Sequence, residues 1–112
     1  MTSRADLARL GELAALRAAR DRAALAAVER RAGPIRAALA RLDVAAPATP
    51  PDDLREARDH ALWQAWAATE RRRLTMELSR LRAELDGARR LAARGTAREA
   101  VIERLRDAPR PR

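Results

Sequence analysis

The 112-residue chain contains no cysteine, phenylalanine, tyrosine or lysine. Without cysteine, neither disulfide bonds nor thiolate metal sites can form. The only aromatic residues are Trp63 and Trp66, so the residue types that favour β-sheets are nearly missing. With one histidine, His60, and four isolated glycines, we expect no histidine metal site, catalytic triad or phosphate-binding loop. We therefore predict a chain that is not an enzyme and that holds no catalytic residue, cofactor or metal.

Long apolar runs are missing as well. No run approaches the ~20 residues that a membrane-spanning helix needs. The first residues, Met-Thr-Ser-Arg-Ala-Asp, lack the apolar segment of a secretory signal. We therefore expect a cytoplasmic protein that does not insert into a membrane.

The residues that are abundant are strong helix formers. The chain has 29 Ala, 15 Leu and 24 Arg, and this composition is typical of coiled coils. Its apolar side chains are mostly methyl groups, which fill a two-helix interface but not the centre of a compact bundle. We therefore predict an all-α fold, with two long helices in an antiparallel coiled-coil hairpin that spans residues 1–112 as a single domain.

The net charge of +8 comes entirely from arginine, but it is spread along the chain. Residues 1–46 carry nine Arg and five acidic residues, and residues 52–95 carry ten and eight. No segment forms the basic block that is typical of nucleic-acid-binding arms. A nucleic-acid partner is thus an alternative that the sequence does not favour.

The first helix is expected over about residues 3–42. Ser3 suits its N-cap, and Asp6 suits the positive end of the helix dipole. An apolar stripe that is interrupted at Asp21 follows the helix: Leu7, Leu10, Ala14, Ala18, Leu25, Val28, Ala32, Ile35, Leu39 and Leu42. From Leu25 onward its spacing is the 3-4 heptad repeat of a coiled coil. Gly33-Pro34 either kinks this helix or ends it at Ala32, and the unbroken heptad favours the kink.

The turn is expected at residues 43–49 and the second helix over about residues 50–94. Thr49 suits its N-cap and Pro50 its first position. The expected stripe of the second helix is Leu54, Leu62, Trp66, Leu74, Leu78, Leu81, Leu85, Ala88 and Leu91. Gly95 is expected to end the helix, and Thr96-Ala97-Arg98-Glu99 matches a capping box that opens a C-terminal extension at 95–112.

This organisation predicts a surface for partner binding. If the turn centres near residue 46, Leu91 lies near Thr2, and residues 96–107 have no helix opposite them. The segment carries the largest apolar side chains near the C-terminus, flanked by arginines, and an exposed apolar helix face usually indicates a partner. The predicted partner-binding residues of this segment are Arg98, Val101, Ile102, Leu105 and Arg106. The alternatives are that the segment folds back on the hairpin or that a second copy covers it.

Trp63 and Trp66 are spaced to share one face of the second helix. We expect them to pack in the helix interface, against small residues such as Ala27 and Ala32. The alternative is an exposed aromatic pair that anchors a partner, because Trp and Arg are enriched at binding hot spots. Trp63, Trp66 and the nearby Arg73 are therefore a second predicted partner-binding group.

The second helix also carries the pattern of a known family. Trp63-Gln64-Ala65-Trp66, Glu70-Arg71-Arg72-Arg73-Leu74 and Leu78-Ser79-Arg80-Leu81-Arg82-Ala83-Glu84, followed by Ala88 to Leu105, resemble the FliJ-like and YscO-like proteins. These are central stalks of the flagellar and type III secretion export ATPases. The resemblance implies a coiled-coil stalk that enters a hexameric ATPase ring by its terminal end and contacts an export gate and export chaperones.

The function predicted from the sequence is therefore a non-catalytic scaffold and interaction protein of bacterial flagellar biogenesis, acting in type III protein export. It would be ATPase-associated, cytoplasmic and peripheral to a membrane-bound export apparatus. Its expected partners are a hexameric export ATPase and an export gate, with no small-molecule substrate. The alternatives are a basic coiled coil that binds nucleic acid or another polyanion, and a self-associating structural coiled coil.

Overall fold

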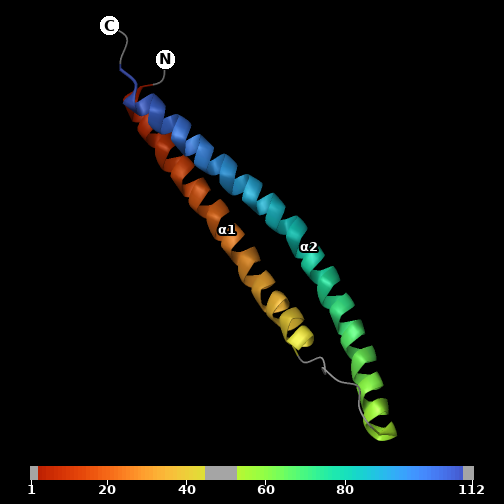
Figure 1. Ribbon diagram of the computed structural model, residues 1–112. Helices are drawn as coiled ribbons and strands as arrows, with labels where there is room; N and C mark the ends of the chain where they lie inside the picture. Colours follow the sequence, from red (N-terminus) through yellow and green to blue (C-terminus); the bar gives the residue numbers. More distant parts are fainter. Residues whose placement is uncertain (1–2, 45–52, 110–112) are drawn as a thin grey trace. The chain divides into compact units, whose positions relative to one another are not determined.

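The protein is all-α, as the sequence predicts. The computed structural model describes residues 3–44 and 53–109, and in these ranges it contains two helices and no strand (Figure 1). The first helix, α1, spans Arg4–Val44, and the second, α2, spans Leu54–Asp107. Where they pair, they run antiparallel. The predicted fold class, two long helices in an antiparallel pair, is confirmed.

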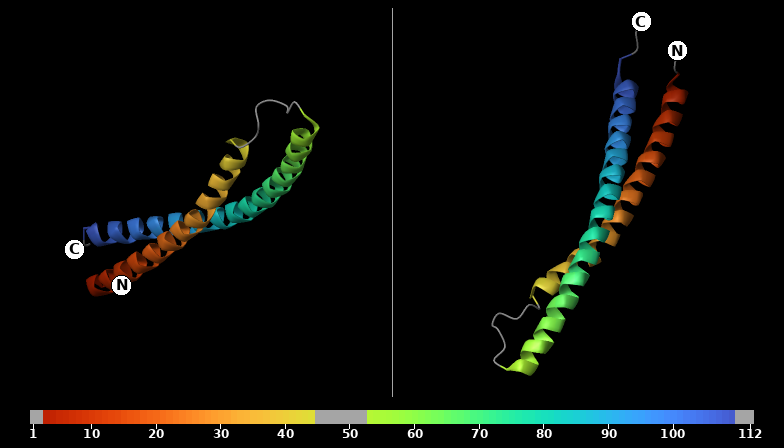
Figure 2. Two further views of the ribbon diagram at one scale, coloured as in Figure 1. Left: turned by 90° about the horizontal axis from the view of Figure 1, so that it is seen from below. Right: turned by 90° about the vertical axis from the view of Figure 1, so that its right-hand side faces the viewer.

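The chain divides into two compact units. Unit 1 contains Met1–Glu29 and Glu84–Arg112, so it pairs the first part of α1 with the last part of α2. Unit 2 is Arg30–Ala83 and pairs the rest of α1 with the first part of α2. In all views, the N-terminal part of α1 and the C-terminal part of α2 lie side by side within unit 1 (Figure 2).

Each helix begins with a side-chain cap. At α1, the backbone N–H of Asp6 donates to Ser3 Oγ at 3.1 Å, so the predicted cap is confirmed. At α2, the N–H of Glu56 donates to Asp53 Oδ1 at 2.7 Å. The residues expected at this start, Thr49 and Pro50, lie outside the described residues. The helix follows Asp53, which satisfies one of the N–H groups that a helix start leaves unpaired.

Pro34 lies inside α1, which continues without a break to Val44. The alternative that the first helix ends at Ala32 is therefore wrong. Ala32 and Ile35 on either side of this proline are both buried. Their packing favours a continued helix despite the hydrogen bond that proline removes.

Gly95 does not end the second helix, so the prediction of a stop there and of a separate extension is wrong. The helix continues for twelve further residues to Asp107. The Thr96 hydroxyl donates to the carbonyl oxygen of Ala92 at 3.1 Å, a bond within the helix, and does not cap a new one. Glycine is tolerated at position 95 because a helix packs directly against it.

In unit 1 most of the buried interface residues are very small, with Leu85 as the one large buried side chain among the described residues of that unit. Ala14, Ala18 and Ala92 are buried, and Ala18 is completely inaccessible. A Cβ placed on Gly95 would lie 3.2 Å from Cα of Ala18. The two backbones therefore approach as closely as helices can, which the predicted stripe with Leu10 and Leu91 does not allow. Those two leucines are about half exposed.

In unit 2 the interface uses larger side chains. Its buried apolar residues are Ala32, Ile35, Leu42, Ala67, Leu74, Leu78 and Leu81. The predictions for the α1 heptad after Leu25 and for the leucine series of α2 are confirmed here. Leu54, Leu62 and Trp66, which were also predicted to lie in the stripe, are exposed.

The register differs from the one expected. In unit 1, Gly95 lies against Ala18, and Gly11 lies against Ile102. In unit 2, Asp43 at the end of α1 pairs with Arg71. The first turns of α2 therefore extend beyond the end of α1, as Figure 1 shows for the green part of the helix. The unpaired end is the start of α2, where Leu54 is 91% exposed, and not residues 96–107.

Candidate partner-binding surfaces

The predicted partner-binding residues near the C-terminus of α2 fall into two groups, one that contacts α1 and one that is accessible. Ile102 and Arg106 lie towards α1 in unit 1. A Cβ on Gly11 would be 3.7 Å from Cγ2 of Ile102 and 3.3 Å from Nη1 of Arg106. These two residues therefore belong to the contact with α1. The expectation that the whole segment lacks a helix opposite is wrong, because the register places residues near Gly11 beside it.

Val101 and Leu105 are each about half exposed. Arg98, one turn before Ile102, is intermediate in exposure. These three predicted residues share one flank of α2. The segment therefore keeps an accessible apolar surface with an arginine beside it, although its helix is paired.

Sequence analysis missed the contribution of α1 to exposed apolar surface. Leu10, Leu13 and Leu16 are all exposed, the last at 69%. Of these three leucines, only Leu10 was predicted to lie in the stripe, and Leu13 and Leu16 lie off it. Ala14 and Ala18 of the predicted stripe are buried, and Gly11 takes the interface position that had been given to Leu10.

Trp63 and Trp66 lie at a groove within unit 2. It has a volume of about 390 Å³ and is lined by Ala38, Arg41 and Leu42 of α1 and by Trp63, Trp66, Glu70 and Leu74 of α2. Trp63 is half-buried and Trp66 is 55% exposed. The prediction that both rings pack in the interface is therefore wrong for Trp66, because Ala67 occupies the buried position. Of the two alternatives, the exposed aromatic side chain is the one that holds for Trp66.

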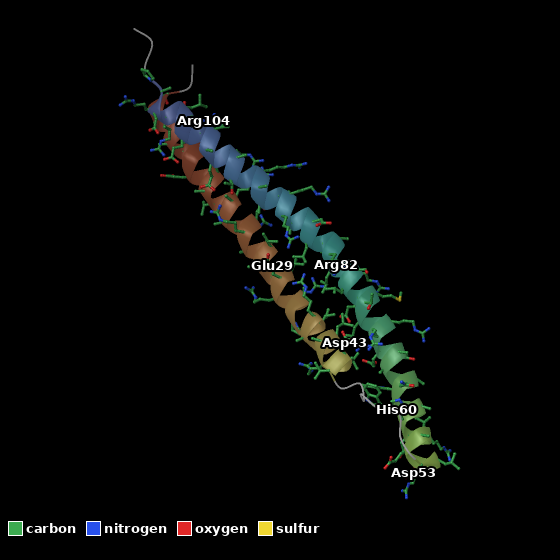
Figure 3. The ribbon with its side chains drawn as sticks, viewed as in Figure 1. Glu29, Asp43, Asp53, His60, Arg82 and Arg104 are labelled. Atoms are coloured by element: carbon green, nitrogen blue, oxygen red, sulfur yellow. The ribbon has the colours of Figure 1, made fainter. Side chains whose placement is uncertain are left out.

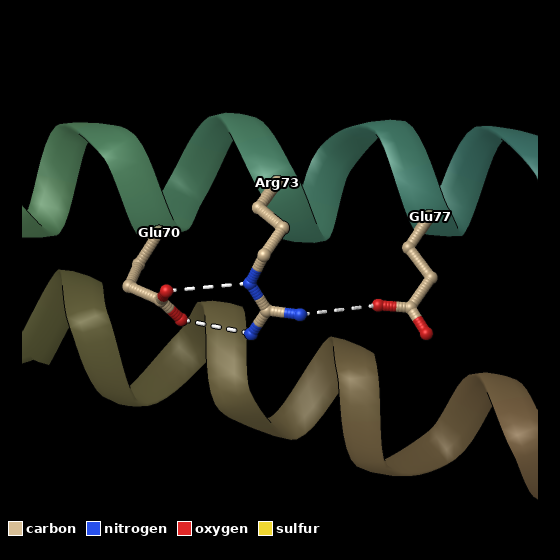
Figure 4. A network of polar contacts seen from close by, with 3 residues as sticks. All are labelled: Glu70, Arg73 and Glu77. Atoms are coloured by element: carbon tan, nitrogen blue, oxygen red, sulfur yellow. Dashed lines mark hydrogen bonds and ion pairs between the residues drawn. The ribbon is translucent and has the colours of Figure 1, made fainter.

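Arg73, the last predicted binding residue, is held by two glutamates of its own helix (Figure 4). Its Nε and Nη2 donate to the two carboxylate oxygens of Glu70 at 3.2 and 2.9 Å. Its Nη1 lies 3.5 Å from Oε2 of Glu77. Such i,i+3 and i,i+4 pairs are weakly stabilising on an exposed helix surface.

This pairing shifts the pKa values of both Glu70 and Arg73. The hydrogen bond from Arg73 lowers the pKa of Glu70 below its ordinary value of 4.5, and the attraction of the positive charge acts in the same direction. Partial desolvation opposes both effects. The hydrogen bond and charge of Glu70 likewise raise the pKa of Arg73. The guanidinium therefore stays charged and oriented along α2.

Two further ion pairs join the two helices, one inside each unit. Arg22 Nη1 lies 3.2 Å from Glu99 Oε1 in unit 1, and Arg71 Nη2 lies 3.1 Å from Asp43 Oδ1 in unit 2. Figure 3 shows Asp43 near the end of α1 and His60 two turns after Asp53 on α2.

Within residues 3–44 and 53–109, no cluster of three or more acidic or histidine side chains could hold a metal ion.

Across the same described ranges, neither helix contains a segment apolar enough to span a membrane. Comparison with known proteins gives no assignment, because no family model, no curated protein and no solved structure matches the chain. The candidate surfaces are therefore defined by their own geometry and charge.

Proposed function

We propose that this protein is a non-catalytic scaffold that acts by binding other proteins. The observation that supports this most directly is the distribution of apolar side chains in unit 1. The buried interface there consists mostly of Ala and Gly together with Leu85, while other leucines and a valine remain exposed. Exposed apolar side chains that gather on a small protein mark an interaction surface.

The biological role that we propose is the central stalk of a flagellar or type III export ATPase. The support is the resemblance of the α2 sequence to FliJ-like proteins, together with the antiparallel helical pair. In this role the protein contacts a hexameric export ATPase and an export gate. It works in the cytoplasm beside the membrane-bound export apparatus, uses no cofactor and has no small-molecule substrate.

Mixing the purified protein with the export ATPase of the same organism tests this role. We expect a rise in ATP turnover that saturates with added protein, while the protein alone hydrolyses no ATP. The double variant Val101→Ser/Leu105→Ser should reduce the stimulation, because both side chains are exposed and their loss leaves the interface of unit 1 intact.

The matched control is Leu16→Ser, which removes an exposed leucine on a different flank of α1. Absence of both binding and stimulation with the wild-type protein would contradict the stalk role. ATP hydrolysis by the protein alone would contradict the proposal that it is not an enzyme.

A further inference from the structure

The exposed apolar residues of unit 1 lie on one side of the helix pair. In α1 the interface follows a heptad through Leu7, Gly11, Ala14 and Ala18. In α2 it follows Leu85, Ala88, Ala92, Gly95, Glu99 and Ile102. These are the less exposed positions of each helix. Relative to this heptad, Leu10 and Leu13 occupy one flank of α1, and Leu91, Val101 and Leu105 occupy the corresponding flank of α2.

Corresponding flanks meet because the helices are antiparallel. Seen along the helix axes, one chain runs towards the viewer and the other runs away. For this reason, the residues that directly precede an interface position in either helix lie on the same side of the pair. Unit 2 shows this directly. Ala38 and Trp66, which precede Leu39 and Ala67, line one groove. Asp43, which follows the interface position Leu42, does not line this groove and pairs with Arg71.

Four arginines lie on the same side of unit 1 as these apolar residues. Arg17 and Arg20 follow Leu10 and Leu13 by one heptad on α1. On α2, Arg98 lies between Leu91 and Leu105 along the same flank, and Arg94 lies one heptad before Val101. We call these nine residues the leucine–arginine face. Within the described residues, none of its four arginines forms an ion pair.

Most acidic residues on the flanks of unit 1 lie away from this face. Glu12, Asp86, Glu103 and Asp107 each follow an interface position, so they lie on the opposite flank. Arg22 on that side pairs with Glu99. Asp6 and Glu84 precede interface positions and lie at the two ends of the leucine–arginine face. Between these two carboxylates the leucine–arginine face carries four arginines and no acidic residue, so its charge is positive.

We propose that the leucine–arginine face binds an acidic amphipathic helix of a partner protein. A helix of about 14 residues, ~20 Å long, matches the span from Leu91 to Leu105. Its apolar residues at every third or fourth position would pack between the exposed leucines, and its carboxylates would pair with the four arginines. This inference rests on the proposed function as a protein-binding scaffold, and it names the chemistry of the partner.

Two other anionic partners fit this face less well. Unit 1 contains no aromatic residue on which nucleic-acid bases could stack, since both tryptophans are in unit 2. A lipid surface favours a continuous apolar strip with basic residues at its edges. Here Arg94 and Arg98 lie between Leu91 and Val101 on α2, so the arginines interrupt the row of apolar residues and do not only border it. This order matches a partner helix that carries carboxylates between its apolar residues.

A labelled peptide tests the proposal directly. The probe is an 18-residue helical peptide with Leu at every third or fourth position and Glu at the flanking positions, and its partner peptide has Lys in place of Glu. Fluorescence anisotropy with the full chain should show at least tenfold tighter binding of the acidic peptide. The double variant Arg17→Glu/Arg98→Glu should weaken that binding at least tenfold.

The matched control variant is Arg9→Glu/Arg89→Glu, which changes the net charge equally but away from the face. It should keep the wild-type affinity within about threefold, and Leu13→Ser/Val101→Ser should lose at least fivefold. Circular dichroism should show unchanged helical content in all variants, because every substituted side chain lies outside the interface.

Several results would overturn the proposal. Equal binding of the acidic and basic peptides, or equal loss in the control variant, would mean that the face does not recognise acidic helices. Binding of a duplex oligonucleotide or of phosphatidylglycerol vesicles that the face variant abolishes, without peptide binding, would assign the face to that partner instead.

ATPase stimulation by the same variants separates the two proposals. Retained stimulation without peptide discrimination would remove the inference about this face but leave the stalk role. Peptide discrimination without stimulation by the wild-type protein would remove the stalk role but leave the face.

Discussion

Gly95 marks the closest approach of the two helices in unit 1. A Cβ at this position would meet the Cα of Ala18 at 3.2 Å and its Cβ at 3.3 Å. The neighbouring atom at 3.2 Å is backbone, so it can give way only if the helices move apart. A helical glycine ordinarily costs stability relative to alanine, so its presence here reflects the close packing.

The first prediction compares two glycine substitutions in α2. Gly87→Ala should stabilise the protein by about 1 kcal/mol, because nothing lies within 4 Å of the added methyl group and alanine favours the helix. Gly95→Ala should instead destabilise it by up to about 2 kcal/mol, because overpacking outweighs the same helix preference. Thermal melting followed by circular dichroism measures both. Equal stabilisation by the two variants would show that the helices are not in close contact at Gly95.

A second prediction concerns the titration of Glu70. Arg73 lowers the pKa of this carboxyl, so the pairing stabilises the folded state above the ordinary pKa near 4.5. That contribution is lost as the pH falls through the lowered pKa of the folded state. Carboxyl-carbon NMR should give a midpoint below 4.5 in the wild type and a higher midpoint in Arg73→Ala. An unchanged midpoint in the variant would show that the pair is not formed in solution.

At the scale of the helices, the interface separates buried leucines from exposed ones, as Leu85 in the predicted stripe and Leu16 off it illustrate. Leu85 is 2% exposed and faces α1, whereas Leu16 is 69% exposed on the outer surface of α1. Both have the same side chain on a long helix rich in Ala and Arg. Their difference comes entirely from their positions in the heptad.

The third prediction follows from that difference. Leu85→Ala should destabilise the protein by about 2–5 kcal/mol, because it removes packed methyl groups and leaves a cavity. Leu16→Ala should change the free energy of unfolding by no more than about 0.5 kcal/mol, as expected for an exposed site. Urea unfolding of the two variants measures this. A similar loss in both would place Leu16 in an interface.

The fourth prediction concerns the start of α2. Asp53→Ala removes the carboxylate that accepts the Glu56 N–H, which costs about 1 kcal/mol of local helix stability. Exchange of that amide with solvent should become about fivefold faster. Asp53→Asn is the matched control, because asparagine caps a helix about as well as aspartate. Equal acceleration in both variants would indicate that charge, and not the cap, protects this amide.

Several elements could be predicted from the sequence because a local rule decides each of them. The cap at Ser3, the heptad of Ile35 and Leu42, and the buried Leu74–Leu85 series follow from residue type and spacing. The interface of unit 1 was predicted only in part, because the stripe included the buried Ala14 and Ala18 but not Ala92 or Gly95. Apolar character alone predicts Leu91 and not Ala92 as the interface residue. Helices that approach this closely, however, leave no room for a leucine side chain between them.

The register was harder to predict, because it depends on how far α2 begins beyond the end of α1. A symmetric turn would place Leu91 near Thr2, whereas the pair between Asp43 and Arg71 shifts α2 by several turns. The candidate binding residues were therefore identified partly for the wrong reason. Val101 and Leu105 are exposed because they lie on an outer flank of α2, not because they lack a partner helix.

For the molecule as a whole, the register decides which surfaces are accessible for binding. With Gly95 against Ala18, the small residues meet, and the leucines and arginines of unit 1 face outwards together. A shift to the symmetric register would place residue 75 opposite residue 18 and would rearrange this side of the pair. The leucine–arginine face and the proposed scaffold role therefore both depend on this register.

Disulfide trapping tests this register most directly, because the chain has no cysteine of its own. The two β-carbons at positions 18 and 95 would be 3.3 Å apart, close to the ~3.5–4.5 Å of a disulfide. Ala18→Cys/Gly95→Cys should therefore oxidise rapidly within one chain under mild conditions, seen as a mobility shift that dithiothreitol reverses. The control Ala18→Cys/Thr75→Cys, which matches the symmetric register, should stay reduced. Cross-linking of the control pair without the first pair would contradict the structure.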